Sequence, residues 1–314
     1  MTATQSRRDF LRLSAAGALG ALGLAQQACR NAAAPGLARR SIDLKKHGIG
    51  LQLYTVRDAM AKDAPGALRM VSNAGYQYVE LAGYANGKFY GYRPAEFKKL
   101  VNDLGMEIIS SHTQVEARGI SPENARRVAE DHTILGAKYC IQPWVVEQER
   151  KTLESYKRIV AEWNQVGRIM KDASIQFGYH NHNFEFDTVE GKVPYYEIIL
   201  ADLDPSLVTM ELDLFWAIKA GQDPVEMFRK YPGRFQLFHM KDMLTAGEKF
   251  YVPSSHDFAP VGAGVTDFKR ILASKDVAGL KYIIVEQDSA KDGRPFDAIG
   301  TSINNLVNEI MVQQ

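Results

Sequence analysis

The chain has little cysteine and almost no excess charge of either sign. Its 314 residues include two cysteines, Cys29 and Cys140, too few for a disulfide framework or a cysteine-rich zinc site. The formal net charge of +1 becomes −2 when the first 34 residues, with four arginines and one aspartate, are set aside. A surface this close to neutral does not attract nucleic acid, which argues against DNA- and RNA-binding proteins.

The sequence also lacks an N-terminal apolar run long enough to cross a bilayer. The run Leu13–Ala25 holds about 13 residues, whereas a spanning helix needs roughly 20. An arginine pair in the segment Ser6–Arg12 precedes this run, which is typical of a twin-arginine export signal. We therefore expect residues 1–34 to direct the protein to the periplasm. The segment Ala32–Ala34 offers a cleavage site, and Cys29 offers a lipid anchor as the alternative.

No Pro/Ser-rich linker or low-complexity segment interrupts the chain after Leu44, and no glycine-rich phosphate turn follows its first β-rich run. The glycines Gly48 and Gly50 lie at the start of that run instead, which argues against a doubly wound nucleotide-binding sheet. What the chain does contain is eight short apolar runs that alternate with longer helical stretches. This pattern predicts one (β/α)₈ TIM barrel over residues 44–314, since such barrels take about 250 residues.

The eight predicted strands are apolar enough to be buried on both faces of a parallel sheet. They are Gly48–Tyr54, Tyr78–Ala82, Glu107–His112, Tyr139–Pro143, Ile175–His180, Val208–Asp213, Phe235–Lys241 and Lys281–Gln287. The clearest predicted helices are Pro94–Leu104, Pro122–Leu135 and Leu153–Asp172.

Every predicted strand ends in polar residues, at the face where barrels carry their active sites. The strand ends offer, in chain order, Gln52, Tyr54 and Arg57; Glu80; His112; Gln142 and Trp144; His180, Asn181 and His182; Glu211 and Asp213; His239, Lys241 and Asp242; and Glu286. Any one of them could be a solvated loop residue or a satisfied core group. Eight strands that all end this way predict a functional site.

Four successive strands supply a predicted metal site. The ligands are His180, Asp213, His239 and Glu286. Two imidazoles and two carboxylates suit one Mn²⁺, Co²⁺, Fe²⁺ or Zn²⁺ ion better than Ca²⁺, and we expect Mn²⁺ first. Alternation along the strand sends His180 and His182 to the same side, so either could be the ligand, and His180 lies nearer the end of the apolar run.

The chain resembles the sugar phosphate isomerase/epimerase superfamily, the xylose isomerase-like TIM barrels, from about Gly48 to its end. The resemblance rests on the motifs Gly50–Asp58, Tyr78–Leu81, Tyr179–His182, Leu212–Trp216, His239–Asp242, Gly262–Gly264 and Val285–Glu286.

This resemblance implies a metal held by Glu, Asp, His and Glu from strands 5 to 8. The last three fall on Asp213, His239 and Glu286, whereas the first falls on His180, which departs from the pattern. In the epimerases of the superfamily the two glutamates also act as bases on opposite faces of the substrate. A histidine in the first place therefore argues against simple two-base epimerisation and favours isomerisation or β-elimination through an enediolate.

Roles for the remaining polar residues follow from their positions. We expect Glu286 to be the catalytic base, with Glu80 and His182 as the next candidates. Other strand-end residues are expected to hold substrate hydroxyls, to stabilise an oxyanion or to form an apolar wall for a sugar ring: His112, Gln142, Lys241, Gln52, Tyr54, Trp144 and Trp216. Gly262 and Gly264 offer backbone donors for a phosphate, or simply form a turn.

The expected activity is that of a metal-dependent isomerase or epimerase whose partner is a small-molecule sugar or keto-sugar without phosphate. The alternatives are a lyase or dehydratase acting on a 3-keto-glycoside or an inosose, and a non-catalytic sugar-binding barrel. We expect no nucleic-acid partner and no membrane span. A homodimer is the expected assembly, because barrels of this kind often pair.

Overall fold

The computed structural model describes residues 48–312, except 116–117, 190, 192, 248, 250–256 and 291–292. The predicted export signal and Cys29 lie outside the described residues, so both stay predictions. Among the residues that are described, no helix combines the length and the apolar character that crossing a membrane requires.

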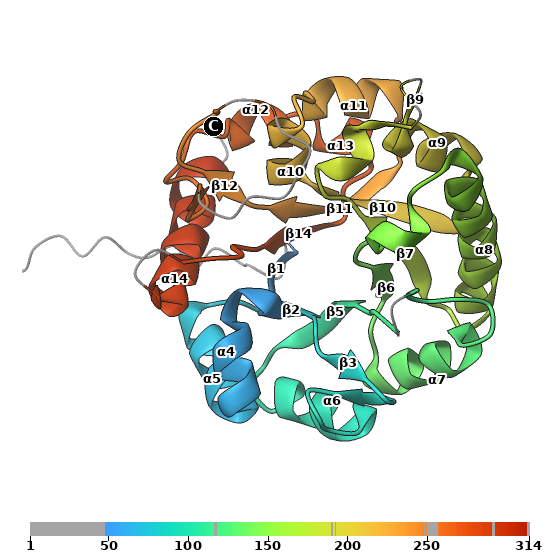
Figure 1. Cartoon of the computed structure of the whole chain (residues 1–314). Helices are drawn as coiled ribbons and strands as arrows, with labels where there is room; N and C mark the ends of the chain where they lie inside the picture. The colour runs from blue at the N-terminus through green and yellow to red at the C-terminus, as the bar shows by residue number, and fades with distance from the viewer. Residues whose placement is uncertain are drawn as a thin grey trace, which may run out of the picture. The chain divides into compact units, whose positions relative to one another are not determined.

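Eight parallel strands close into a barrel, which confirms the predicted fold (Figure 1). The order around the barrel is β1, β14, β11, β10, β7, β6, β5 and β2. The strands are β1 Ile49–Gln52, β2 Tyr78–Leu81, β5 Glu107–His112, β6 Tyr139–Gln142, β7 Gln176–His180, β10 Val208–Asp213, β11 Phe235–Met240 and β14 Tyr282–Val285.

Helices form an outer ring around these strands (Figure 1). They are α4 Arg57–Lys62, α5 Ala64–Ala74, α6 Pro94–Asn102, α7 Ala125–Leu135, α8 Leu153–Asp172, α9 Tyr195–Asp202, α10 Leu214–Lys219, α11 Pro224–Lys230, α12 Phe268–Leu272, α13 Lys275–Ala278 and α14 Pro295–Asn305. Helix α8 has the predicted bounds. Helix α7 begins three residues late, because the amides of Asn124 and Ala125 both donate to the Ser121 carbonyl and form a turn first.

Three short antiparallel pairs and several single helical turns lie in the connections. The pairs are β3 Tyr84–Ala85 with β4 Lys88–Phe89, β8 Thr188–Val189 with β9 Val193–Pro194, and β12 Asp242–Met243 with β13 Phe258–Ala259. The turns are η1 Leu53–Val56, η2 Glu147–Glu149, η3 Phe184–Phe186 and η5 Leu306–Ile310.

The first and last strands are shorter than predicted. Strand β1 ends at Gln52, whose side chain accepts a hydrogen bond from the Tyr54 amide at 3.0 Å and so starts the turn η1. Strand β14 ends at Val285, and Glu286 follows it directly. In both places the chain leaves the sheet at the face where the polar residues gather.

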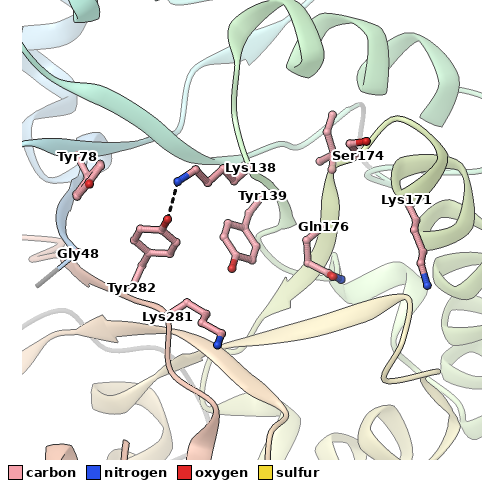
Figure 2. A pocket seen from close by; sticks show the side chains of 10 residues that line it. Gly48, Tyr78, Lys138, Tyr139, Lys171, Ser174, Gln176, Lys281 and Tyr282 are labelled. Carbon is pink, nitrogen blue, oxygen red and sulfur yellow. Dashed lines mark hydrogen bonds between the residues drawn. The ribbon is translucent and has the colours of Figure 1, made fainter. Parts of the chain in front are cut away.

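The barrel interior is layered from its amino-terminal end upward. Tyr282 packs edge-on against Tyr78 and Tyr139, with ring centroids 5.8 and 6.0 Å apart. These tyrosines pack against a layer of aliphatic side chains: Ile109, Ile141, Leu237 and Ile284. A basin of about 550 Å³ lies at this end. Lys138, which lines it, donates to the Tyr282 hydroxyl at 2.7 Å, and Figure 2 draws this bond among the lining side chains. The tyrosines thus close the barrel below the polar cluster.

One carboxylate joins strand β11 to the loop that follows β13. Asp242 accepts four backbone hydrogen bonds of 2.8–3.1 Å, from the amides of Met243, Gly262, Gly264 and Thr266. A Cβ atom at Gly264 would lie 2.2 Å from the Met243 carbonyl oxygen, so only glycine fits there. The two glycine amides considered for phosphate binding therefore donate to Asp242 and are not available to a phosphate.

We expect Asp242→Ala to destabilise the fold by about 2–4 kcal/mol, because it leaves several amide donors without an acceptor. Urea unfolding followed by circular dichroism measures the change. The control is Asp172→Ala at the exposed end of α8, which should stay within about 0.5 kcal/mol of the parent. Equal stability of both variants would contradict this role of Asp242.

The buried imidazole of His132 should make the fold sensitive to acid. Its Nδ1 bonds to the Val128 carbonyl at 2.7 Å, so Nε2 accepts from Thr113 at 3.0 Å. Burial lowers the pKa of His132 from 6.5 to about 4. Protons therefore bind first to the unfolded chain, and stability is lost as pH falls from about 6.5 toward 4. Relative to His132→Gln, the parent should lose about 3 kcal/mol between pH 7 and pH 4 in urea titrations. Parallel pH profiles would contradict this.

Candidate active site and metal centre

A cavity of about 810 Å³ opens at the carboxyl ends of the barrel strands. Nine of the residues singled out from the sequence line it: Tyr54, Arg57, His112, Trp144, His180, His182, Trp216, Lys241 and Glu286. Tyr84, Phe258 and Asp288 also contribute to its lining. The cavity therefore joins side chains from nearly every strand end.

Four predicted ligands meet at the floor of this cavity, and we call His180, Asp213, His239 and Glu286 the outer set. Their ligand atoms all lie within 4.8 Å of one another, and all four residues are buried. His180 Nε2 lies 3.7 Å from Asp213 Oδ2, and His239 Nδ1 lies 3.9 Å from the same oxygen. Of the two histidines considered as the strand-5 ligand, His180 is the one in this set.

The outer set fits a divalent cation. Asp213 Oδ2 is buried, and although the Lys241 ammonium lies 3.1 Å away, this oxygen accepts no well-formed hydrogen bond and keeps a lone pair for a cation. Ligand bonds of about 2.1 Å in tetrahedral geometry separate neighbouring ligand atoms by roughly 3.4 Å. The 3.7 and 3.9 Å separations around Asp213 Oδ2 are close to that spacing.

Lys241 joins the outer set to a further carboxylate. Its Nζ lies 3.1 Å from Asp213 Oδ2, 2.7 Å from Glu286 Oε2 and 2.9 Å from Asp288 Oδ1. Burial alone would lower the pKa of Lys241, but the charges of Asp213, Asp288 and Glu286 raise it well above its usual value. The side chain is thus an ammonium held at the cavity floor.

Three more polar side chains contact the histidines of the outer set. They are His112, Glu80 and Glu211, and we call them the inner set. Glu211 Oε2 lies 2.6 Å from His112 Nε2 and 3.0 Å from His180 Nδ1. Glu80 Oε1 lies 2.6 Å from His239 Nε2. The structure places Glu80 fully buried and outside the cavity lining, which does not suit the general base that the sequence suggested.

The two glutamates of the inner set differ in charge. Burial would raise the pKa of Glu80, but the charges of His112 and His239 and the hydrogen bond from His239 lower it to about 2. Burial, and then the charge of Glu80, raise the pKa of Glu211 to about 7. Of the two glutamates, Glu80 is therefore the one that stays ionised near neutral pH.

Two residues predicted to bind substrate, Gln52 and Gln142, form hydrogen bonds to other protein groups instead. Gln52 Nε2 donates to Glu80 at 2.8 Å. Gln142 accepts from the Ile120 amide at 2.9 Å and donates to Gln114 and to the Trp144 carbonyl. Neither glutamine lines the cavity. Gln52 therefore supports the inner set, and Gln142 fixes the loops after β5 and β6.

Aromatic side chains form one wall of the cavity. The ring of His182 lies 5.8 Å from Trp216 and 6.3 Å from Trp144, measured between centroids. Trp144 and Tyr54 are each 43% exposed, which leaves their faces open to a ligand. Burial, and then the charge of Lys241, lower the pKa of His182 to about 3, so its imidazole is neutral.

Comparison with known proteins agrees with this architecture. Residues 68–306 match the family model described as the xylose isomerase-like TIM barrel. The chain belongs to this family. A solved barrel from Parabacteroides distasonis ATCC 8503, titled sugar phosphate isomerase/epimerase, is 32% identical with a TM-score of 0.73, and the match covers 84% of this chain and 99% of that one.

More distant relatives and solved structures have names that state an activity or a ligand. An inosose dehydratase from Geobacillus kaustophilus is 24% identical over 71% of this chain and 80% of its own length. The match to the enzyme of the same name from Clostridium tetani covers 50% of that protein. The zinc-bound IolI protein shares the fold at 14% identity, with a TM-score of 0.66 over 85% of this chain and 100% of that one.

Two residues of this xylose isomerase-like barrel were not assigned roles from the sequence. Glu211 lies two residues before Asp213, and strand alternation sends both side chains into the barrel. Asp288 follows Glu286 by two residues in the same way, beyond the end of β14. The spacing of two residues from a predicted metal ligand was therefore the sequence signal that could have pointed to Glu211 and Asp288.

Asp213→Asn should weaken binding of Co²⁺ by more than the roughly 10–100-fold that loss of an outer-shell partner costs, because it removes a direct ligand. Visible absorption during Co²⁺ titration measures the affinity. Asp288→Asn is the matched control, since Asp288 also contacts Lys241 but lies outside the outer set. Equal losses in both variants would contradict the assignment of the outer set.

Proposed function

We propose that this xylose isomerase-like barrel is a divalent-metal-dependent lyase that dehydrates a cyclic keto-polyol without phosphate, of the inosose class. The observation that carries the proposal is the Lys241–Asp288 pair, which lies beside the outer set at the cavity floor. The names of the inosose dehydratases and of the zinc-bound IolI protein support it.

The outer set would hold the cation through His180, Asp213, His239 and Glu286. When bound, a divalent cation supplies Lewis-acid polarisation of the substrate carbonyl and an adjacent hydroxyl. Glu286 would then be engaged as a ligand, while its Oε2 also meets Lys241 and His239. This leaves it poorly suited to the role of base that the sequence suggested.

Asp288 is the better base on geometric grounds. It lines the cavity and lies outside the outer set. Burial raises the pKa of Asp288 to about 6, which suits a group that must take up and release a proton near neutral pH. Its carboxylate removes the proton from the carbon next to the carbonyl, and the electron pair of the broken C–H bond delocalises onto the carbonyl oxygen.

Lys241 is the acid of the same step. Its ammonium lies 2.9 Å from Asp288, so acid and base reach the substrate from one side of the cavity. The C–O bond at the β-carbon breaks as the electron pair returns to form the carbon–carbon double bond. The leaving hydroxyl takes a proton from Lys241 and departs as water, and the proton on Asp288 restores Lys241.

The surroundings of the cavity favour a neutral, ring-shaped substrate. Among the described lining residues, one arginine and one lysine occur, Arg57 and Lys241, and both donate to Asp288: Arg57 to its carbonyl and Lys241 to its carboxylate. The amides of Gly262 and Gly264 donate to Asp242. The aromatic wall of Trp144 and Trp216 would pack on the apolar face of a polyol ring.

An isomerase or epimerase is the second candidate, supported by the name of the Parabacteroides distasonis structure. One observation favours it. His182 lines the cavity as a neutral imidazole, and its Nδ1 has no hydrogen-bond partner. Its imidazole could accept a proton from the substrate on the wall that carries Trp216. The periplasmic location and the homodimer expected from the sequence remain part of the proposal.

Loading the metal-free protein with Mn²⁺ should give dehydration of a free inosose, followed by product NMR in deuterium oxide. Asp288→Asn should reduce kcat by about 10²–10⁴-fold, the usual contribution of a general base. Chelation should abolish turnover. Deuterium incorporation without loss of water would favour the isomerase instead. Saturable sugar binding without either reaction would contradict both and indicate a sugar-binding barrel.

A further inference from the structure

The two histidines of the outer set each face two ways. His180 points Nε2 toward Asp213 of the outer set and Nδ1 toward Glu211 of the inner set. His239 points Nδ1 toward Glu286 of the outer set and Nε2 toward Glu80 of the inner set. Each ring therefore has one nitrogen for a cation and one for a carboxylate behind it.

Both sides bring ligand atoms together, since His112, His180, Glu211 and His239 also lie within 4.8 Å of one another, but the distances favour the outer side for the cation. On the inner side, the carboxylate oxygens lie 2.6 Å from His112 Nε2, 3.0 Å from His180 Nδ1 and 2.6 Å from His239 Nε2. These are hydrogen-bond lengths, and each gap is filled by a proton. On the outer side, Asp213 Oδ2 lies 3.7 and 3.9 Å from the two rings, which leaves room for an ion. One contact there is short, His239 Nδ1 to Glu286 Oε2 at 2.9 Å, and an ion bound by both would replace the proton between them.

We propose that Glu211 and Glu80 are positioning residues that fix the tautomers of the two metal-binding histidines, an inference that rests on the metal site of the proposed function. A proton on His180 Nδ1 is held by Glu211, which leaves Nε2 as a lone pair. A proton on His239 Nε2 is held by Glu80, so a cation takes Nδ1, where it replaces the proton shared with Glu286 Oε2 at 2.9 Å. With the cation bound, both rings then present lone pairs to one point.

The inner carboxylates are themselves held in place. His112 bonds to Glu211 Oε2 at 2.6 Å, and Gln52 donates to Glu80 Oε1 at 2.8 Å. The second oxygens, Glu211 Oε1 and Glu80 Oε2, are buried without a hydrogen-bond partner. In each carboxylate, therefore, one oxygen accepts all of the hydrogen bonds. This gives Gln52, Glu80 and His112 a shared purpose, which is to hold the histidines of the metal site.

The arrangement also explains why the strand-5 position can carry a histidine. An imidazole ligand needs an acceptor for its second nitrogen, whereas a carboxylate ligand does not. Glu211 of the neighbouring strand β10 supplies that acceptor, since His180 and Glu211 are paired in the register of β7 and β10. His180 and Glu211 therefore form one functional unit across two strands.

The first test observes the tautomers directly in the wild-type protein, with no substitution that could disturb folding. Long-range proton–nitrogen NMR of the Zn²⁺-loaded protein, labelled with ¹⁵N-histidine, distinguishes protonated from metal-bound nitrogens. The expected result is one equivalent of Zn²⁺, with protons on His180 Nδ1 and His239 Nε2. Protons on the opposite nitrogens would overturn the proposal. Binding of two equivalents, with both nitrogens of each ring bound, would also overturn it.

The second test compares two buried carboxylates. Glu211→Gln should weaken Zn²⁺ binding by about 10–100-fold in competition with a chelator, and should shift the His180 resonances. Glu80→Gln should do the same for His239. Glu185→Gln is the matched control, because Glu185 is buried against the Tyr179 hydroxyl and the His182 amide, outside both sets. It should keep the wild-type Zn²⁺ affinity.

Failure of this inference can be told apart from failure of the proposed function. Unchanged Zn²⁺ affinity and histidine shifts in Glu211→Gln and Glu80→Gln would overturn the positioning role, even if the loaded wild-type enzyme dehydrates an inosose. The expected losses of affinity would uphold it, even if the loaded enzyme turns over no keto-polyol.

Discussion

Buried negative charge is the constraint on which this structure depends. Four carboxylates, Glu80, Glu211, Asp213 and Glu286, lie almost without solvent contact at the upper end of the barrel. Burial of an unpaired carboxylate costs several kcal/mol, so each one needs a cation or a donor close by. Lys241 and the imidazoles meet part of this need, and a divalent ion in the outer set would meet the rest. The positions of the polar side chains follow from this balance.

The need to balance buried negative charge also explains which side chains lie below and above the carboxylates in the barrel. Below the carboxylates the barrel is filled by aliphatic and tyrosine side chains, which exclude water from the amino-terminal end. Above them the cavity is lined by aromatic rings and by the Lys241–Asp288 pair. These four carboxylates thus lie in one layer, where their charge is poorly screened and acts strongly on whatever binds above it.

Much of this arrangement could be predicted from the sequence, because it depends on periodicity. Apolar runs separated by helical stretches predicted the eight strands, and alternation brought His180, Asp213, His239 and Glu286 to one rim. Whether a strand-end side chain lines the cavity or lies beneath it was harder to predict. Glu80 ends its strand as the ligands do, yet it lies beneath the cavity, bound to Gln52 and His239. Gln142 likewise lies at a strand end, but its amide holds neighbouring loops.

These misjudged roles share a physical cause. Strand alternation fixes the side of the sheet on which a residue lies, but tertiary contacts decide whether its polar atoms meet solvent or protein. Glu211 shows the converse, since its importance lies in contacts with three histidines from other strands. The spacing of two from Asp213 reports that Glu211 faces the barrel interior, but no local pattern in the sequence reports which three histidines meet it there.

The Asp242 carboxylate has a consequence for how this barrel could change its specificity. It joins the end of β11, directly after Lys241, to the backbone that follows β13, and Phe258 of β13 lines the cavity. The chain between these two anchor points can therefore vary in length and composition while its ends stay in place. A new substrate could be accommodated by exchanging that segment, with the acid–base pair and the metal ligands left undisturbed.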